Sequence, residues 1–352
     1  MAENNKNSFW KDKKVFITGH TGFKGGWTSI WLNQLGAKIK GYSLSPKNKN
    51  NLFEICNIES FVETDLNNIN NLSILSKSLK DFEPDILIHM AAQPLVIDSY
   101  KDPIETFNTN VIGTANVLEA SRSCESIKVI LNITTDKCYE NSEQNLSYKE
   151  TDPMGGYDPY SASKGCAELV IAAYRRSFFS NTNIGVASVR AGNVIGGGDW
   201  SQNRLIPDIL DAFNDKRKVV IRNPHAIRPW QHVLEPLAGY LELIEKLYRD
   251  PSEYSSGWNF GPNEEDIKSV EWITNYMCNQ FPNSKWQIDD SNQLHEAQLL
   301  QLDISKAKSY LNWKPKWTIE TSLKKIINWH NHWLSGYDMH RACLDDINEY
   351  TR

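Results

Sequence analysis

The sequence predicts an α/β protein, built on a doubly wound parallel sheet with a smaller C-terminal, substrate-binding lobe. Two observations predict this fold. Short apolar runs rich in β-branched residues alternate with segments of helical length through the first 190 residues, which is typical of a parallel sheet with helices on both faces. From about residue 191, loops rich in Gly, Asn, Arg and Pro alternate with short helices, as expected for a second lobe.

Six apolar runs are expected to form the strands of this sheet, at residues 14–20, 38–44, 60–66, 85–92, 128–135 and 183–190. The expected domains are therefore residues 1–190, the sheet domain, and residues 191–352, mainly the second lobe. Parts near 232–262 are expected to return to the large domain, because they contain a helical segment followed by the strand-like run Gly-Trp-Asn-Phe-Gly.

Composition excludes several classes of function. With a net charge of −5, the chain has no basic surface of the kind that nucleic acid or anionic membranes select. The polar N-terminus and the absence of any long apolar stretch predict a cytoplasmic protein with no membrane partner. The six cysteines lack metal-ligand spacing, so we expect reduced thiols and no metal site.

A glycine-rich turn follows the first predicted strand. Gly19, Gly22 and Gly25 are spaced G-x-x-G-x-x-G at the start of a predicted helix, where glycines let the backbone approach a pyrophosphate at the positive helix end. The alternative is a tight turn without a ligand. Because the turn follows a predicted strand, begins a predicted helix and lies near the N-terminus, we predict a Rossmann-type dinucleotide site. Its expected contacts in this turn are Gly19, His20, Gly22, Phe23, Lys24 and Gly25.

Later strand ends provide further cofactor contacts. Asp65, followed by Leu66 after the third strand, is positioned to meet the adenine edge, although an exposed strand-end aspartate is the alternative. Ala91 and Ala92 close the fourth strand and would let a cofactor lie close to the sheet. Ser43 ends the second strand, where an acid would normally clasp the adenosine ribose, so this position does not distinguish NAD from NADP.

A tyrosine and a lysine lie one helical turn apart in the segment Tyr-Ser-Ala-Ser-Lys. The spacing of Tyr160 and Lys164 puts both on one face of a helix. A cation beside a phenol favours the phenolate and lowers its pKa from about 10, which would make Tyr160 a usable base. The same spacing also occurs by chance on solvated helices. Its position after a predicted dinucleotide-binding turn nevertheless favours a catalytic pair.

At this point the chain resembles the extended short-chain dehydrogenase/reductase family. The motifs TGHTGFKG, AAQ, NTNVIGT, YSASK and RAGNVIG occur in that family's order along nearly the whole chain. The resemblance implies NAD as cofactor, a sugar-nucleotide substrate, and catalytic roles for Thr135, Tyr160 and Lys164. It also implies a homo-oligomer, a dimer or tetramer, with subunits paired through helices of the large domain.

An acid and a base follow the fifth strand, as Asp136 and Lys137. Within the resembled family, sugar-nucleotide 4,6-dehydratases carry such a pair, typically Thr-Asp-Glu, and the motifs GHTGFKG, TTDKCYEN and RPWQHV are similar to the CDP-glucose 4,6-dehydratase subgroup. That subgroup forms CDP-4-keto-6-deoxyglucose for deoxysugars of surface polysaccharide. The alternatives are dehydration of a GDP-, UDP- or dTDP-sugar, then a 4-epimerase or reductase, then a cofactor-binding regulator without turnover.

The proposed chemistry assigns each of these side chains a task. Tyr160 would take the proton of the sugar 4-hydroxyl, and the resulting ketone acidifies the C5–H. Asp136 would protonate the departing 6-hydroxyl, which requires burial, because a solvated aspartate with a pKa near 4 is ionised. Lys137 would take the C5 proton if its pKa is depressed. Otherwise it stabilises the enolate by its charge, or Tyr160 or a water molecule moves the proton. The alternative for Asp136-Lys137 is a solvated surface turn.

The second lobe contains candidates for binding the substrate diphosphate. Arginine's planar fork suits phosphate oxygens, and the resemblance implies that Asn193 and Arg228 contact the diphosphate. Arg204 and Arg222 are further candidates, and each could instead pair with a surface carboxylate. Together with Thr135, these residues complete the predicted substrate site.

Overall fold

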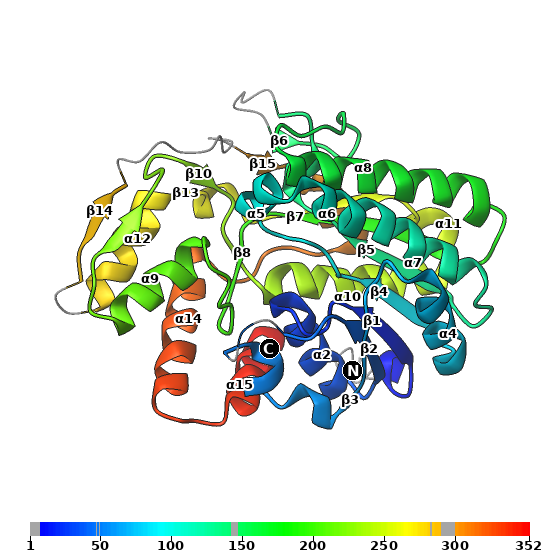
Figure 1. The fold of residues 1–352 in the computed structure, drawn as a ribbon, viewed down its shortest axis with the longest axis horizontal. Helices are drawn as coiled ribbons and strands as arrows, with labels where there is room; N and C mark the ends of the chain where they lie inside the picture. Colours follow the sequence, from blue (N-terminus) through cyan, green and yellow to red (C-terminus); the bar gives the residue numbers. More distant parts are fainter. Residues whose placement is uncertain (1–7, 47, 49, 142–146, 282–283, 290–299) are drawn as a thin grey trace.

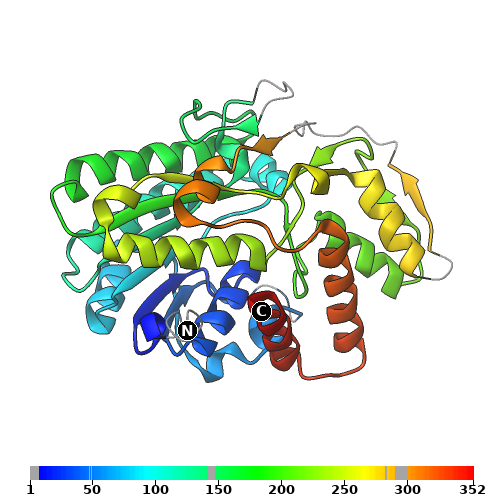
Figure 2. The same ribbon diagram turned by 180° about the vertical axis from the view of Figure 1, so that it is seen from behind.

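A computed structural model describes residues 8–46, 48, 50–141, 147–281, 284–289 and 300–352 (Figures 1 and 2). A seven-stranded parallel sheet forms its centre, with the strand order β12-β7-β5-β4-β1-β2-β3. The predicted doubly wound fold is confirmed, and each of the six expected runs forms a strand. The strands are β1 (Lys14–Thr18), β2 (Lys38–Ser43), β3 (Val62–Leu66), β4 (Ile86–His89), β5 (Val129–Ile133), β7 (Gly185–Ala191) and β12 (Gly257–Phe260).

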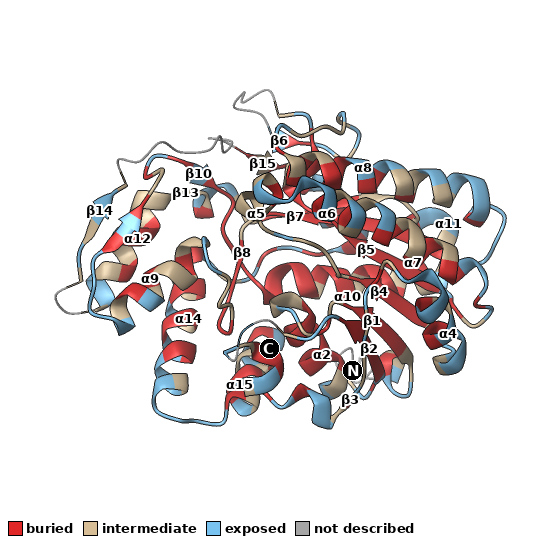
Figure 3. Ribbon diagram, viewed as in Figure 1, coloured by how far each residue is buried: buried red, intermediate tan, exposed pale blue. Residues whose placement is uncertain are grey.

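Helices cover both faces of this sheet (Figures 1 and 2), so its central strands are largely buried (Figure 3), which explains why they are apolar on both sides. Side chains alternate between the faces of a strand, so Phe16 of β1 packs into one core while Val15 and Ile17 join the other. The core around Phe16 includes residues of α4 (Leu72–Phe82), α7 (Gly113–Arg122) and α8 (Pro159–Tyr174). The opposite core includes residues of α2 (Phe23–Gln34), α10 (Leu234–Arg249) and α15 (Met339–Thr351).

The second lobe has its own hydrophobic core, at the left of Figure 1. Apolar side chains of its helices and short strands form this core, and two of the strands pair in parallel, with Gln287 opposite Val220. The lobe contains α9 (Leu205–Asn214), β9 (Val219–Ile221), α12 (Val270–Gln280), β14 (Trp286–Ile288) and α14 (Ile319–Leu334). Helices α3 (Leu52–Ile55), α5 (Val96–Lys101), α6 (Pro103–Phe107), α11 (Pro251–Tyr254) and α13 (Ser305–Leu311) lie in connections.

Two later segments pack on the large sheet. Strand β12 pairs in parallel with β7, with Trp258 opposite Val189, and α10 contacts β5 and β7. The C-terminal helix α15 lies against α2, an arrangement that the sequence analysis did not anticipate. Among the described helices, none has the length and apolar character needed to cross a membrane. The described residues also contain no cluster of three or more potential metal ligands, and all six cysteines are free.

A buried ion pair joins α8 to β7. Arg190 donates from Nε and Nη2 to the two oxygens of Glu168, at 3.0 and 2.8 Å, and the side chains are only 6% and 4% exposed. Thr134 at the end of β5 donates to the same carboxylate at 2.5 Å. Burial tends to raise the pKa of Glu168, but Arg190 and the hydrogen bonds outweigh it and lower this pKa.

The same arginine connects the ion pair to the edge strand β12. Arg190 Nη1 donates to the Tyr139 hydroxyl at 2.6 Å, and that hydroxyl donates to Asn259 Oδ1 at 2.7 Å. Asn259 belongs to β12, so one hydrogen-bonded network links β5, β7, β12 and α8.

We expect Arg190→Met to lower the free energy of unfolding by about 3–5 kcal/mol, because it leaves the Glu168 carboxylate buried without its partner. As a matched control, Arg217→Met removes a partner of Asp211 at 3.0 Å, but those side chains are 47% and 70% exposed, so the loss should stay below about 1 kcal/mol. Urea unfolding of the two variants measures the difference. Equal losses would contradict a structural role for the buried pair.

Candidate active site

A cavity of about 870 Å³ lies at the carboxyl ends of the sheet strands and extends to the second lobe. Chain order reverses between β4 and β1, which is where ligands bind in open parallel sheets. All but three of the predicted site residues line this cavity. The lining residues are Gly19, Gly22, Phe23, Lys24, Gly25, Ala91, Ala92, Thr135, Asp136, Lys137, Tyr160, Lys164, Asn193, Arg204, Arg222 and Arg228.

The glycine turn packs too closely for side chains. Gly19 has φ +79°, and a Cβ there would come within 2.7 Å of the Ala91 backbone nitrogen. A Cβ on Gly25 would overlap the Gly19 carbonyl oxygen. Helix α2 begins directly after Gly22, which provides no side-chain cap, and the first-turn residues Phe23, Lys24 and Gly25 line the cavity. This arrangement fits a pyrophosphate, since uncapped N-terminal amides bind anions.

Three predicted cofactor contacts do not reach the cavity. The Asp65 carboxylate accepts a hydrogen bond from Ser78 at 2.5 Å and lies 3.6 Å from the Lys40 ammonium, and neither Asp65 nor Leu66 lines the cavity. His20 is fully buried, and its ring occupies the space that a side chain at Gly41 would need. Burial lowers the His20 pKa to about 4, which keeps the ring neutral.

Other polar residues line this end of the cavity instead. Ser43 lies in the wall, where its hydroxyl is 2.8 Å from that of Thr21, and Asn67 and Asn68 follow the end of β3. The sequence analysis missed the two asparagines. Their position directly after a strand at the carboxyl edge was the signal that could have identified them.

Lys24 extends from the glycine turn toward the other charged groups of the cavity. Burial is the main cause that lowers its pKa to about 7, and the nearby cations of Arg204 and Lys164 lower it further. Asp136 and Asp199 act in the opposite direction. Lys24 therefore lies within electrostatic reach of both the fifth-strand acid and the second lobe.

Tyr160 and Lys164 lie in the first two turns of α8 and are 8% and 6% exposed. Asp158 caps this helix by accepting from the Ser161 backbone at 2.9 Å. Lys164 Nζ donates to the Ile133 carbonyl at 3.4 Å, and burial lowers the lysine pKa to about 8. The tyrosine differs from our prediction. Burial raises its pKa to about 12, and the opposing effect comes first from a hydrogen bond with Thr135, not from Lys164.

The end of β5 turns into a short 3-10 segment that carries the acid and the base. Thr135 caps this segment by accepting from the Lys137 backbone N–H at 3.4 Å, while its own hydroxyl donates to Asp136 Oδ1 at 2.9 Å. Asp136 is 3% exposed, so the solvated-turn alternative does not describe it. Lys137 is partly exposed and lines the cavity.

The second lobe contributes cations to the same cavity. Arg204 pairs with Asp199 at 3.0 Å, and that carboxylate side chain is only 6% exposed, so the partner is not the surface acid that we considered. The acid after three consecutive glycines was a signal that the sequence analysis missed. Arg228 is buried, and Arg222 donates to the Asn203 carbonyl at 3.2 Å.

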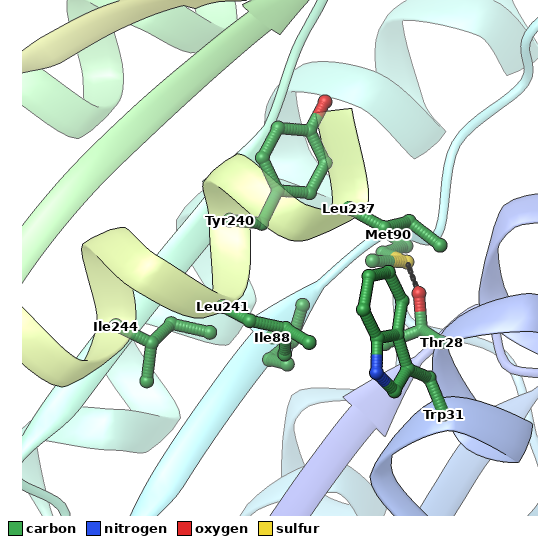
Figure 4. A pocket seen from close by; sticks show the side chains of 8 residues that line it. All are labelled: Thr28, Trp31, Ile88, Met90, Leu237, Tyr240, Leu241 and Ile244. Carbon is green, nitrogen blue, oxygen red and sulfur yellow. Dashed lines mark hydrogen bonds between the residues drawn. The ribbon is translucent and has the colours of Figure 1, made fainter. Parts of the chain in front are cut away.

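A second, much smaller void of about 10 Å³ lies behind this cavity, between α2, β4 and α10 (Figure 4). Its lining exposes no polar surface, and Thr28 donates to the Met90 sulfur at 3.7 Å beside it. A space of this size and character admits no ligand, so it belongs to the packing of the core.

Comparison with known proteins identifies the family. Residues 16–326 match the family described as GDP-mannose 4,6 dehydratase. The chain belongs to this family. It is 50% identical over 349 residues to the CDP-glucose 4,6-dehydratase of Salmonella typhimurium, with 97% of each chain covered. The predicted membership of the extended short-chain dehydrogenase/reductase family is thereby confirmed.

More distant relatives share the fold. The chain is 26% identical to the dTDP-glucose 4,6-dehydratase of Escherichia coli, covering 90% of this chain and 93% of that one. The solved dTDP-glucose 4,6-dehydratase of Bacillus anthracis superposes with a TM-score of 0.76 at 20% identity, covering 93% and 99%. The UDP-glucose 4-epimerase of Thermotoga maritima gives 0.80 at 18% identity, covering 91% and 99%.

We expect Gly192→Ala to reduce activity on the sugar nucleotide by about 10²-fold or more, because a Cβ at Gly192 would overlap the Asp136 carboxylate and displace it. Gly261→Ala is the control, since its nearest neighbours are the side chains of Ile304 and Leu302 at 3.5 and 3.7 Å. Steady-state assays of both variants, with circular dichroism as a check of folding, test this expectation. Full activity in Gly192→Ala would contradict the observed placement of Asp136.

Proposed function

We propose that the protein is a CDP-glucose 4,6-dehydratase, which converts CDP-glucose to CDP-4-keto-6-deoxyglucose and water with NAD as cofactor. The observation that carries this proposal is that Thr135, Asp136 and Lys137 line the same cavity as Tyr160 and Lys164. An epimerase or a simple reductase needs no acid to expel a hydroxyl group, whereas a dehydratase does. The 50% identity to the Salmonella enzyme supports CDP as the nucleotide.

The residues around the glycine turn fit NAD. Gly19, Gly22 and Gly25 would allow the pyrophosphate to reach the first turn of α2, and Ala91 and Ala92 would let the cofactor lie against the end of β4. Phe23 and Lys24 would also contact it. Bound NAD supplies a reversible acceptor for the hydride of the sugar C4, and its oxidised ring carries a positive charge. That charge favours the phenolate of Tyr160.

In the first step, the side chains of α8 and β5 handle the 4-hydroxyl. Tyr160 would take its proton, and the nearby Thr135 hydroxyl acts to lower the pKa of the phenol against the effect of burial. Lys164 anchors the end of β5 through the Ile133 carbonyl and would hold the ribose beside the reacting carbon. Asn193 and Arg228, with Arg204 and Arg222, would hold the substrate diphosphate by charge-assisted hydrogen bonds.

In the second step, the pair after β5 removes water. Lys137 is the proposed base for the C5 proton, which the new C4 ketone acidifies. Asp136 donates its proton to the 6-hydroxyl, which leaves as water. Lys137 would then return its proton to C5 as C6 is reduced. Because this sequence restores the cofactor, the net reaction is elimination and the enzyme is a hydro-lyase.

Three further properties are proposed with this function. We place the enzyme in the cytoplasm, as the composition of the chain predicts, and its product in the synthesis of deoxysugars for polysaccharide, as the family resemblance implies. We also propose a homo-oligomer paired through α8 and the neighbouring helices. Apolar side chains exposed on these segments support this, namely Ile104, Ile112, Leu169 and Phe178, which are 69%, 51%, 60% and 45% exposed.

A panel of CDP-, GDP-, UDP- and dTDP-glucose tests the function, with mass spectrometry for the loss of one water. We expect dehydration of CDP-glucose with a kcat/KM at least about tenfold above that of each other nucleotide. Preference for another nucleotide would correct the substrate. Isomerisation without water loss would instead indicate an epimerase, and NAD binding without turnover of any substrate would indicate a regulator.

Exchange of the C5 hydrogen with solvent tests the base. We expect Lys137→Met to slow this exchange by about 10²–10⁴-fold, because general-base catalysis contributes that much. Lys80→Met, on the exposed surface of α4, is the control and should exchange as the parent enzyme does. Unchanged exchange in Lys137→Met would assign the proton transfer to Tyr160 or a water molecule.

A further inference from the structure

The segment after β4 forms one wall of the proposed NAD site, and the end nearest the glycine turn is held by a hydroxyl group. The residues of this wall, Met90 to Gln93, line the cavity. The backbone N–H groups of Met90 and Ala91 both donate to the hydroxyl of Thr18, at 3.1 and 3.2 Å. Because Thr18 directly precedes Gly19, this one hydroxyl joins the end of β1 to the wall.

A buried histidine at the end of β4 determines the direction of that hydroxyl. His89 is only 4% exposed, and its Nδ1 lies 2.8 Å from the Thr18 hydroxyl. A hydroxyl has one proton and two acceptor positions. The two backbone N–H groups of the wall occupy both acceptor positions of Thr18, so its proton is left for His89. Nδ1 is therefore the unprotonated nitrogen of the ring.

The contact on the other side of the imidazole ring indicates the same tautomer. His89 Nε2 lies 3.1 Å from the Thr114 hydroxyl, which donates its own proton to the Asn110 carbonyl at 2.6 Å. Thr114 can therefore only accept from the histidine, which requires a proton on Nε2. Burial, with a smaller effect of the Lys164 ammonium, lowers the pKa of His89 to about 3, so the ring is neutral near pH 7. Two independent neighbours thus select one tautomer, in which Nδ1 accepts and Nε2 donates.

The same hydrogen-bonded network holds the far end of the wall. The Asn110 side chain accepts from the Gln93 backbone N–H at 2.8 Å and donates to the Gln93 carbonyl at 3.0 Å. Its amide also donates to the Ser163 hydroxyl at 2.8 Å, on the helix that carries the catalytic tyrosine. His89 thus supports the near end of the wall, whereas Asn110 makes the contact with α8.

We propose that His89, as the neutral Nε2–H tautomer, is a positioning residue for NAD, because it fixes the Thr18 hydroxyl and thereby the wall of the cofactor site after β4. The ring lies outside the cavity lining, so it acts through Thr18 and does not touch the ligand. It holds its proton throughout and exchanges none with the substrate. The inference rests on the proposed function, in which NAD binds at this wall.

Nuclear magnetic resonance of protein with isotope-labelled histidine nitrogens tests the tautomer directly. The His89 signals are identified by their loss in His89→Asn. We expect a proton on Nε2 and none on Nδ1, with no change between about pH 6 and about pH 8, because the ring stays neutral in this range. A proton on Nδ1, or a charged ring, would contradict the proposed hydrogen-bond directions.

Calorimetric titration of the cofactor-free protein with NAD tests the positioning role. For His89→Leu we expect about a tenfold loss of NAD affinity, because the Thr18 proton is left without its partner. At saturating NAD and CDP-glucose, kcat should fall by less than about threefold, since the contacts of Asn110 with α8 remain. His89→Asn keeps an acceptor near the place of Nδ1 and should recover most of the affinity. Unchanged NAD affinity in His89→Leu would overturn the proposal.

His330→Leu is the matched control, because His330 is also 4% exposed but lies 3.0 Å from Asn214 Oδ1 in the second lobe. It should lower the free energy of unfolding and leave NAD affinity unchanged. An equal loss of NAD affinity in both variants would leave His89 only a general structural role and reject the proposal. If His89→Leu does not fold, Thr18→Val replaces it with the same expectation, and Thr18→Ser is its control. Failure of the wild-type enzyme to dehydrate CDP-glucose, with the NAD results as expected, would overturn the proposed function alone.

Discussion

The ion pair of Glu168 with Arg190 determines how the active site is assembled. Glu168 lies one turn beyond Lys164 on α8, and its carboxylate accepts from Thr134, the residue before Thr135. One buried group therefore fixes the helix that carries the tyrosine and lysine against the strand end that carries the acid. Removing both charges from water is costly, and only the four hydrogen bonds to this carboxylate make the arrangement favourable.

A second constraint is the close approach of backbones around the cavity. Gly19 brings the turn after β1 against the end of β4, Gly25 lets the first turn of α2 pack against that turn, and Gly192 makes room for the Asp136 carboxylate. These glycines have different structural roles. The first two leave no side chain between the turn and the start of α2, whereas Gly192 allows an acid to be buried against a strand end. Cofactor and acid can thus lie near one another without a side chain between them.

The sheet was predictable because its strands are buried on both faces and alternate with helices. In the sequence such strands are short, continuous apolar runs separated by segments of helical length. Most of the predicted site residues line one cavity for a related reason, since loops at the carboxyl ends of parallel strands converge whatever their separation in sequence. The return of α15 to α2 depends on tertiary packing and has no local signature. The same is true of His20, whose burial over Gly41 turns an expected cofactor contact into a core residue.

Electrostatics were the least predictable part of the site. Spacing placed Tyr160 and Lys164 on one face of a helix correctly, but it could not reveal that burial dominates both groups. The resulting pKa directions oppose the simple picture of an ammonium lowering the pKa of a phenol. Burial within the protein alone therefore favours the neutral phenol of Tyr160.

The cations of the cavity make substrate binding and protonation mutually dependent. Burial and the neighbouring charges of Arg204 and Lys164 lower the pKa of Lys24 to about 7, and Lys164 itself is lowered to about 8. A bound diphosphate brings negative charge among these groups and favours their protonated forms. Binding must then take up protons at a pH above these values, and rising pH must weaken it by the same linkage. A bound diphosphate therefore increases the charged fraction of Lys24 and Lys164.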